Sequence, residues 1–323
     1  MNKEIITRIS TYRLVIALVV LTVFVISMLI SPQYTGGDQI HYRRVYDEIT
    51  FLGLKDAYEY YRSNLDSREL VHFIIVYFAS PIMGKDLLMS VFNAGLAYSA
   101  LKLCRTHGVS PIIAALIPLS NYYFFTMYFS AERLKFAMIF VILGINYINK
   151  QRLFFLYCVL AVLSHAQTII IYASVLMQHI FNGLIYTLKN GKIPIYIIIL
   201  PIVAIGILAV NIEQISSKFI SYYQDRSLME INRSLIFLML TLYVSKNKIN
   251  AIIIFIPILI ATFLVGGDRV NMLSYFTFLY YALQYKRGVN APNIILMLYF
   301  AGKTILFVDD IVNHGTGFPE AEI

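Results

Sequence analysis

Long apolar runs, separated by short polar segments, make up most of this chain of 323 residues. A helix that crosses a membrane needs about 20 mostly apolar residues, and most of the runs approach that length. The pattern therefore predicts an all-α, polytopic membrane protein with about 11 spans, within a range of about 10–12, in a single transmembrane domain over 1–323. The expected spans are residues 13–31, 86–104, 110–129, 132–148, 153–164, 167–187, 193–211, 233–245, 249–266, 270–285 and 292–308.

The positions of the charges predict which side of the membrane each loop occupies. Lys and Arg accumulate in the cytoplasmic loops of membrane proteins. With the N-terminus in the cytoplasm, the acids other than Glu4 lie outside or near outer span ends. The cytoplasmic segments then hold 13 cations, which are Lys3, Arg8, Arg13, Lys102, Arg105, Lys150, Arg152, Lys189, Lys192, Lys246, Lys248, Lys286 and Arg287.

Residues 32–85 form the longest polar interruption and predict a large extracytoplasmic loop. Its part from Asp38 to Asn64 is charged and rich in tyrosine at helical spacing, which favours amphipathic helix. The apolar stretch from Val71 to Met83 is too short to cross, and a crossing here would invert every later loop. We therefore interpret it as an interfacial or re-entrant helix. A second such loop, 212–232, is also expected to be amphipathic helix.

Composition agrees with a membrane protein and excludes other classes. The chain is 59% hydrophobic and 14% charged, with a mean hydropathy of +0.70, whereas soluble domains carry about 25% charged residues. The net charge of +8 does not indicate nucleic acid as a partner, because half of the cations lie in short loops between apolar runs. The sequence has no nucleotide-binding glycine loop, no HExxH and no cysteine cluster, so neither a metal nor a cofactor is expected.

Several candidate functional residues lie at outer span ends. Asp38 suits a helix N-cap, and Tyr42 and Tyr46 follow one turn apart. This is the pattern of a carboxylate with aromatic faces for a sugar, or simply of a capped amphipathic helix on the membrane surface. Arg133 and Lys135 at the start of a span could hold a diphosphate, since guanidinium matches phosphate oxygens. The alternative is snorkelling to the interface.

Arg269 follows two glycines, Gly266 and Gly267, that would let the backbone approach a ligand. The alternative is a tight turn in which Asp268 pairs with Arg269. Arg226 and Arg233, which flank the second loop, are further candidates for phosphate contacts.

His165 occupies a break in the apolar stretch 153–187, within Ser164-His165-Ala166-Gln167. The stretch predicts a helical hairpin whose tip lies partly within the membrane. Irregular backbone at that depth is tolerated where it is buried or lines a wet cavity. We therefore expect an outward-opening cavity with His165 at its wall, or else a hydrogen-bonded structural histidine.

Three parts of the sequence, in this order, resemble the O-antigen and exopolysaccharide polymerases of the Wzy and EpsG type. Gly37-Asp38 with Tyr42 resembles the G-x-D-x-x-x-Y pattern after the first span. Glu69 resembles a glutamate in an E-P-x-x-Y setting, with Leu70 in place of the proline. Arg133-x-x-x-Ala137 and the later Leu163-Ser164-His165 resemble the R-x-x-x-A and F-H elements, although Leu163-Ser164 replaces the usual aromatic residue.

The resemblance implies a GT-C-like, metal-independent glycosyltransferase of the bacterial inner membrane. It would join undecaprenyl-diphosphate-linked oligosaccharides into O-antigen or a related polysaccharide at the periplasmic face, with membrane lipid and a chain-length regulator as further partners. The candidate bases are His165, Asp38 and Glu69, because imidazole exchanges protons near neutral pH and carboxylates accept them. The diphosphate would contact cationic side chains and the sugar would stack on aromatic ones, namely Arg133, Arg269, Lys135, Arg226, Arg233, Tyr42 and Tyr46.

Two other functions remain open from the sequence. One is a flippase that transports the same lipid-linked oligosaccharide. The other is an enzyme that transfers single sugars or acyl groups. Transporters usually carry charges in mid-span and have paired halves, whereas the charges here cluster at outer span ends beside a large acidic loop. This difference favours the polymerase.

Overall fold

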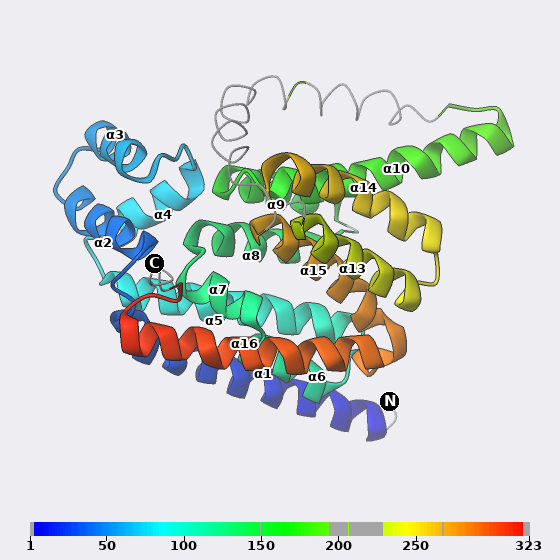
Figure 1. Cartoon of the computed structure of the whole chain (residues 1–323), viewed down its shortest axis with the longest axis horizontal. Helices are drawn as coiled ribbons and strands as arrows, with labels where there is room; N and C mark the ends of the chain where they lie inside the picture. The colour runs from blue at the N-terminus through cyan, green and yellow to red at the C-terminus, as the bar shows by residue number, and fades with distance from the viewer. Residues whose placement is uncertain (1–2, 149, 194–205, 207–228, 267, 319–323) are drawn as a thin grey trace. The chain divides into compact units, whose positions relative to one another are not determined.

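The computed structural model describes residues 3–148, 150–193, 206, 229–266 and 268–318, and the regular elements of these residues are all helices (Figure 1). This confirms the predicted all-α class. Short 3₁₀ turns follow α1 and α15. The α-helices are α1 Lys3–Ile30, α2 Asp38–Ile49, α3 Leu54–Leu65, α4 Leu70–Ala79, α5 Lys85–Thr106, α6 Pro111–Ser120, α7 Tyr122–Phe129, α8 Glu132–Asn146, α9 Gln151–Ser164, α10 Thr168–Asn190, α13 Met229–Val244, α14 Lys248–Val265, α15 Asp268–Gln284 and α16 Ala291–His314.

Three stretches are long and apolar enough to cross a membrane: Thr11–Gln33, Lys85–Thr106 and Thr168–Asn190. Helices α6 and α7 pass the same test together but bend by 48° between them, so they are a broken span or a re-entrant loop. The other predicted spans among the described residues coincide with α8, α9, α13, α14, α15 and α16, which are not among these candidates, and 193–211 lies almost wholly outside the described residues. A total of eleven spans therefore stays a prediction.

The helices form two compact units, 1–168 with 287–323, and 169–286. In the second unit, α13, α14 and α15 pack together. Their contact is partly polar, because Ser234 Oγ lies 2.8 Å from Asn271 Oδ1 and 2.6 Å from Ser274 Oγ. Buried hydroxyl and amide groups paired in this way satisfy each other away from water. The prediction of a single domain over 1–323 stays open.

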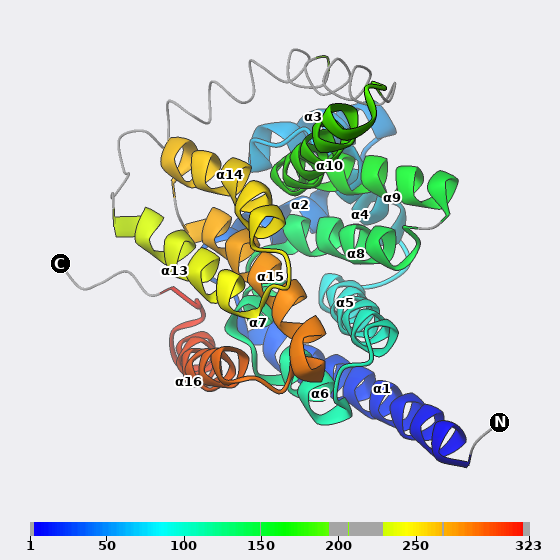
Figure 2. The same ribbon diagram turned by 90° about the vertical axis from the view of Figure 1, so that its right-hand side faces the viewer.

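In the first unit, α1 and α5 lie side by side and run in opposite directions (Figures 1 and 2). Near the end of α1, Asn93 Nδ2 donates to Ser27 Oγ over 3.0 Å. Near its start, the Tyr12 hydroxyl donates to the Val109 carbonyl, just beyond α5. The two helices thus give this unit two distinct ends.

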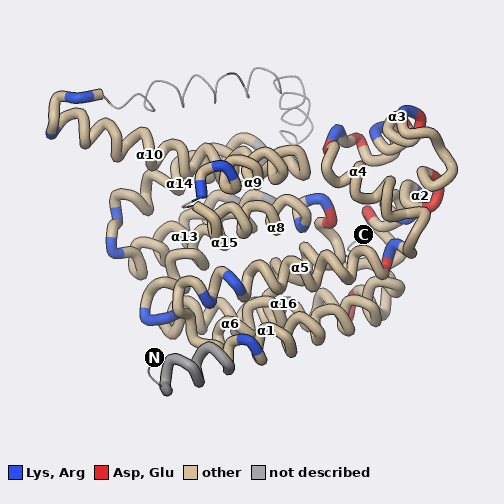
Figure 3. Tube along the Cα trace, turned by 180° about the vertical axis from the view of Figure 1, so that it is seen from behind, with Lys and Arg blue, Asp and Glu red and all other residues tan. Residues whose placement is uncertain are grey.

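The end beside the chain's N-terminus is basic. Arg13 follows Tyr12 there, and Arg287 Nε donates to the carbonyl of Gly108 over 3.2 Å. At the opposite end, α2–α4 carry most of the acidic side chains of this unit, mixed with basic ones (Figure 3). Basic residues therefore lie at both ends of this unit, whereas most of its acidic residues lie at the end with α2–α4.

The polar loop 32–85 is folded into three helices that share one apolar core. Tyr46 of α2, Tyr61 of α3 and Phe73 of α4 are buried there against Phe136 of α8. The amphipathic helix that we predicted over 38–64 is thus two helices, interrupted before Gly53. Helix α4 has 10 residues, which rise about 15 Å, half the thickness of a bilayer core of about 30 Å.

The start of α2 differs from the prediction in one respect. The N-cap is Gly37, with φ 56° and ψ −140°, and Asp38 is the first helical residue. This backbone conformation is accessible to glycine and strained for other residues. Gly36 N donates to the carbonyl of Gly315 over 2.7 Å, so the segment after α16 holds this turn. The chain therefore turns on Gly37, which leaves Asp38 in the first turn of α2.

Candidate functional site

Glu69 is the centre of a buried polar cluster in the first unit. It caps the N-terminus of α4, and its side chain is only 5% exposed. One oxygen, Oε2, accepts from Arg133 Nη1 over 2.9 Å and from Ser67 Oγ over 2.7 Å. The other, Oε1, pairs with His165 Nδ1. The cluster therefore joins the start of α8, the loop before α4 and the end of α9.

Arg133 connects the cluster to α2. Its Nε donates to the Tyr42 hydroxyl over 2.9 Å, and its guanidinium carbon lies 5.8 Å from the centre of the Tyr42 ring. Burial raises the pKa of Tyr42 to about 12, although the charge of Arg133 opposes the rise. The phenol thus stays protonated at neutral pH. Arg133 keeps its Nη2 without a hydrogen bond among the described residues, so this group can contact phosphate oxygens.

The break at His165 is confirmed. Helix α9 ends at Ser164, and His165 has extended backbone angles, φ −163° and ψ 121°. The imidazole is buried between the Glu69 carboxylate at Nδ1 and the Gln167 side-chain oxygen, 3.1 Å from Nε2. A carboxylate at Nδ1 fixes the proton on that nitrogen and orients the ring. The Gln167 oxygen is an acceptor, so its contact matches a proton on Nε2, and Nε2 can accept a proton from a substrate only when that oxygen has turned away.

The electrostatics of the cluster distinguish Glu69 from His165. Burial by itself would raise the pKa of Glu69, but the hydrogen bond and charge of His165 lower it, as do Arg133 and Ser67. Together they hold the pKa of Glu69 well below its ordinary value of 4.5. A carboxylate this acidic is a weak base. Glu69 therefore suits the orientation of His165 and Arg133 better than proton abstraction.

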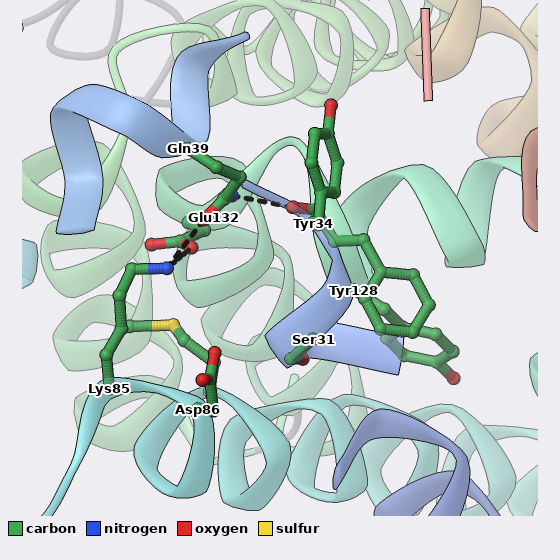
Figure 4. Close-up of a pocket in the computed structure, with 9 residues that line it drawn as sticks. Ser31, Tyr34, Gln39, Lys85, Asp86, Tyr128 and Glu132 are labelled. Atoms are coloured by element: carbon green, nitrogen blue, oxygen red, sulfur yellow. Dashed lines mark hydrogen bonds and ion pairs between the residues drawn. The ribbon is translucent and has the colours of Figure 1, made fainter. Parts of the chain in front are cut away.

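A second buried cluster was not predicted from the sequence. Lys85 Nζ, at the start of α5, donates to Gln39 Oε1 over 2.6 Å and to Glu132 Oε1 over 2.5 Å. Gln39 Nε2 in turn donates to the carbonyl of Phe129 over 2.7 Å. Figure 4 shows these three side chains converging from α2, α5 and α8. The available signal was that Lys85 and Glu132 are opposite charges at the outer ends of two predicted spans.

These side chains line a pocket of about 210 Å³, a volume that includes its open mouth. Its enclosed part has room for a group of the size of a water molecule. The outward-opening cavity that we predicted had His165 at its wall, whereas the residues that line this pocket are Ser31, Tyr34, Gln39, Lys85, Asp86, Met89, Tyr128, Phe129 and Glu132.

Three of the predicted site residues lie outside the Glu69 cluster. The Tyr46 hydroxyl donates to the carbonyl of Met83 over 2.6 Å, and its ring belongs to the apolar core, so it has no open face for a sugar. Asp38 is exposed. Lys135 is fully buried and donates to Asn93 Oδ1 over 2.6 Å. Because positions i and i+2 of a helix face different directions, Lys135 and Arg133 do not form one cationic pair.

The remaining predicted cations are not placed beside Glu69. Arg269 belongs to α15 and the exposed Arg233 to α13, both in the second unit. Arg226 lies outside the described residues. A role for these three arginines at a diphosphate therefore stays a prediction.

Among the described residues, no group of three or more His, Cys, Asp and Glu side chains could hold a metal ion. Comparison with protein-family models, with curated proteins and with solved structures gives no match to this chain. The geometry of the two clusters is therefore the basis on which a function can be assigned.

Proposed function

We propose that this chain is a glycosyltransferase that polymerises oligosaccharide repeats carried on undecaprenyl diphosphate, at the periplasmic face of the bacterial inner membrane. One observation carries the proposal: Glu69, Arg133, His165 and Tyr42, from four separate segments, form one buried hydrogen-bonded cluster. Such convergence of an imidazole, a carboxylate and a guanidinium is typical of transfer sites that need a base and an anion-binding group.

The proposed topology places this cluster on the periplasmic side. If α1 crosses with its N-terminus in the cytoplasm, the basic end of the first unit follows the positive-inside rule. The end with α2–α4 and Glu69 then faces the periplasm. In this topology the chain crosses the membrane about 11 times, and α4 does not cross it.

His165 is the proposed base. Glu69 holds the proton on Nδ1, so Nε2 accepts the proton of the acceptor hydroxyl as that oxygen attacks the anomeric carbon. For this step the Gln167 oxygen turns away, Nε2 is without its proton, and the acceptor hydroxyl becomes the donor to it. A base within hydrogen-bond reach typically contributes about 10²–10⁴-fold to the rate.

Arg133 is the proposed electrophilic group. As the bond from the anomeric carbon to the phosphate oxygen breaks, its electron pair leaves with the diphosphate of the growing chain. The N–H groups of the Arg133 guanidinium that are not used by Glu69 and Tyr42 stabilise this charge. One glycosidic bond forms and one sugar–phosphate bond breaks, and the proton lost by the hydroxyl is held by His165.

A gel of surface polysaccharide separates this proposal from a flippase. Cells that lack a polymerase keep a single repeat unit on the lipid core and lose the ladder of longer products. Cells that lack a flippase show no repeat outside at all. A normal ladder in cells without this chain would exclude both the polymerase and the flippase function.

Single substitutions then test the cluster itself. Arg133→Ala and His165→Ala are expected to leave only the single-repeat product, because each removes a group that acts on the reacting atoms. The matched controls are Arg44→Ala and His41→Ala, which change the same residue types at exposed positions of α2. The controls should keep the ladder when all four variants are present in the membrane in equal amounts.

A further inference from the structure

The cluster of Gln39, Lys85 and Glu132 carries two hydrogen-bonding groups that have no partner among the described residues. Glu132 is only 2% exposed, and its Oε2 has no hydrogen-bond partner among the described residues. An ammonium group has three N–H donors, and Lys85 uses two of them, on Gln39 and Glu132. A buried carboxylate oxygen without a partner is costly, so this arrangement favours a bound polar group.

The charges indicate which kind of group would bind. Lys85 and Glu132 neutralise each other, and so do Arg43 and Asp86, whose Nη2 and Oδ1 lie 2.9 Å apart. A free cation would be repelled by Lys85 and an anion by Glu132. A neutral hydroxyl can donate to the Glu132 oxygen and accept from Lys85 at the same time.

The walls of the pocket limit how much of a sugar can enter it. Ser31, Tyr34 and Tyr128 are among the residues that line it (Figure 4). Both tyrosines are only 2% exposed, so they close the pocket and have no open face for a sugar ring. The enclosed part of the pocket admits a hydroxyl, and its open mouth leaves the rest of the ring outside.

Tyr42 connects this pocket to the proposed catalytic cluster. The centre of its ring lies 5.8 Å from the guanidinium carbon of Arg133 and 5.9 Å from Lys85 Nζ. Glu132 directly precedes Arg133 in α8, so the two side chains leave the helix in different directions, one toward the pocket and one toward the Glu69 cluster. An oligosaccharide whose diphosphate contacts Arg133 would extend past Tyr42 to bring one of its sugars to Glu132 and Lys85.

We infer that Glu132 and Lys85 form a saccharide-recognition subsite, in which they hold one hydroxyl of a neutral sugar residue of the lipid-linked repeat. The inference rests on the proposed function for its substrate class. It assigns to these two residues the choice between sugars that differ at one hydroxyl. A site built to bind a hydroxyl discriminates strongly against an analogue that lacks it, because its buried polar groups are then left unpaired.

Binding of simple sugars to the purified full-length chain in lipid nanodiscs tests the subsite without polymerisation. The probes are methyl glycosides of neutral hexoses, detected by saturation-transfer NMR. At least one should bind the wild type, and its deoxy analogue at one position should bind about tenfold more weakly or worse. The double variant Lys85→Met with Glu132→Gln should bind the glycoside more weakly than the wild type by the same factor. It removes both charges together, which is often neutral for stability.

The control is Glu48→Gln, an exposed carboxylate of α2, which should bind as the wild type does. The subsite is overturned if no glycoside binds the wild type, or if the folded double variant binds as tightly as the wild type. The polysaccharide gel reports on the proposed function separately. If the double variant keeps both a normal ladder and normal sugar binding, the subsite alone is rejected. If the wild type binds the sugar but does not polymerise the repeats, the polymerase alone is rejected.

Discussion

At the scale of single residues, Glu69 determines how the proposed site is charged. Its carboxylate is the shared acceptor of Arg133, Ser67 and His165. Removal of one partner from a buried ion pair leaves the other charge without compensation. Glu69→Ala should therefore harm both stability and the position of the other two groups, whereas Glu69→Gln keeps the shape and removes the charge.

The stability that Glu69 contributes should depend on pH. Because its pKa is lower in the folded chain than its ordinary value of 4.5, the unfolded chain binds the proton more tightly. The contribution is fully present above pH 4.5 and is lost as the pH falls below that value. Thermal unfolding should show Glu69→Gln to be less stable than the wild type by about 1–3 kcal/mol at neutral pH. The gap should narrow in acid, and a gap that widens there would contradict the assignment.

Tyr42 and Tyr46 provide a matched pair of phenols on one helix. Both are buried, but Tyr42 accepts from Arg133 whereas Tyr46 donates to the backbone of Met83. Tyr42→Phe should shorten or abolish the polysaccharide ladder, because Arg133 Nε loses its acceptor. Tyr46→Phe should lower the unfolding temperature and leave the ladder unchanged. Equal effects of the two substitutions on the ladder would argue against a site at Arg133.

At the scale of elements, the turn at Gly37 sets the position of α2 and hence of Tyr42 and Gln39. Gly37 has φ 56°, and Gly53, the N-cap of α3, has φ −63°. Gly37→Ala should destabilise the chain by about 1–3 kcal/mol through backbone strain. Gly53→Ala, with an ordinary conformation, should be close to neutral. Chemical denaturation of both variants measures the difference, and equal effects would rule out strain at Gly37.

The sequence predicted most helices but not how their side chains pair. Apolar length and turn residues located the end of α1, both ends of α5 and the break at His165, because these features are local. They did not locate the start of α1, which begins at Lys3 and not at residue 13. Lys85 and Glu132 are 47 positions apart, and their contact depends on how α5 packs against α8. The periodicity of a single sequence does not indicate which distant side chains pair. The sequence also does not reveal the φ angle that makes Gly37 the N-cap of α2.

At the scale of the whole molecule, the proposed topology makes a direct prediction about accessibility. In a background without Cys104 and Cys158, a cysteine at Asp47 in α2 should react with an impermeant thiol reagent added outside. So should one at Ile82, which is exposed beyond α4. A cysteine at Lys246, between α13 and α14, should react only after the membrane is opened. If the external reagent labels the cysteine at position 47 but not the one at position 82, α4 crosses the membrane.

The most direct test of the central claim is polymerisation by the purified chain, given a synthetic oligosaccharide on undecaprenyl diphosphate. If the chain is a polymerase, it should give products of two and more repeats and release undecaprenyl diphosphate, with and without chelator. His165→Ala should lower the rate by about 10²-fold or more, and Arg133→Ala should do the same. Monomeric product from the wild type, or full activity in the folded His165→Ala variant, would contradict this claim.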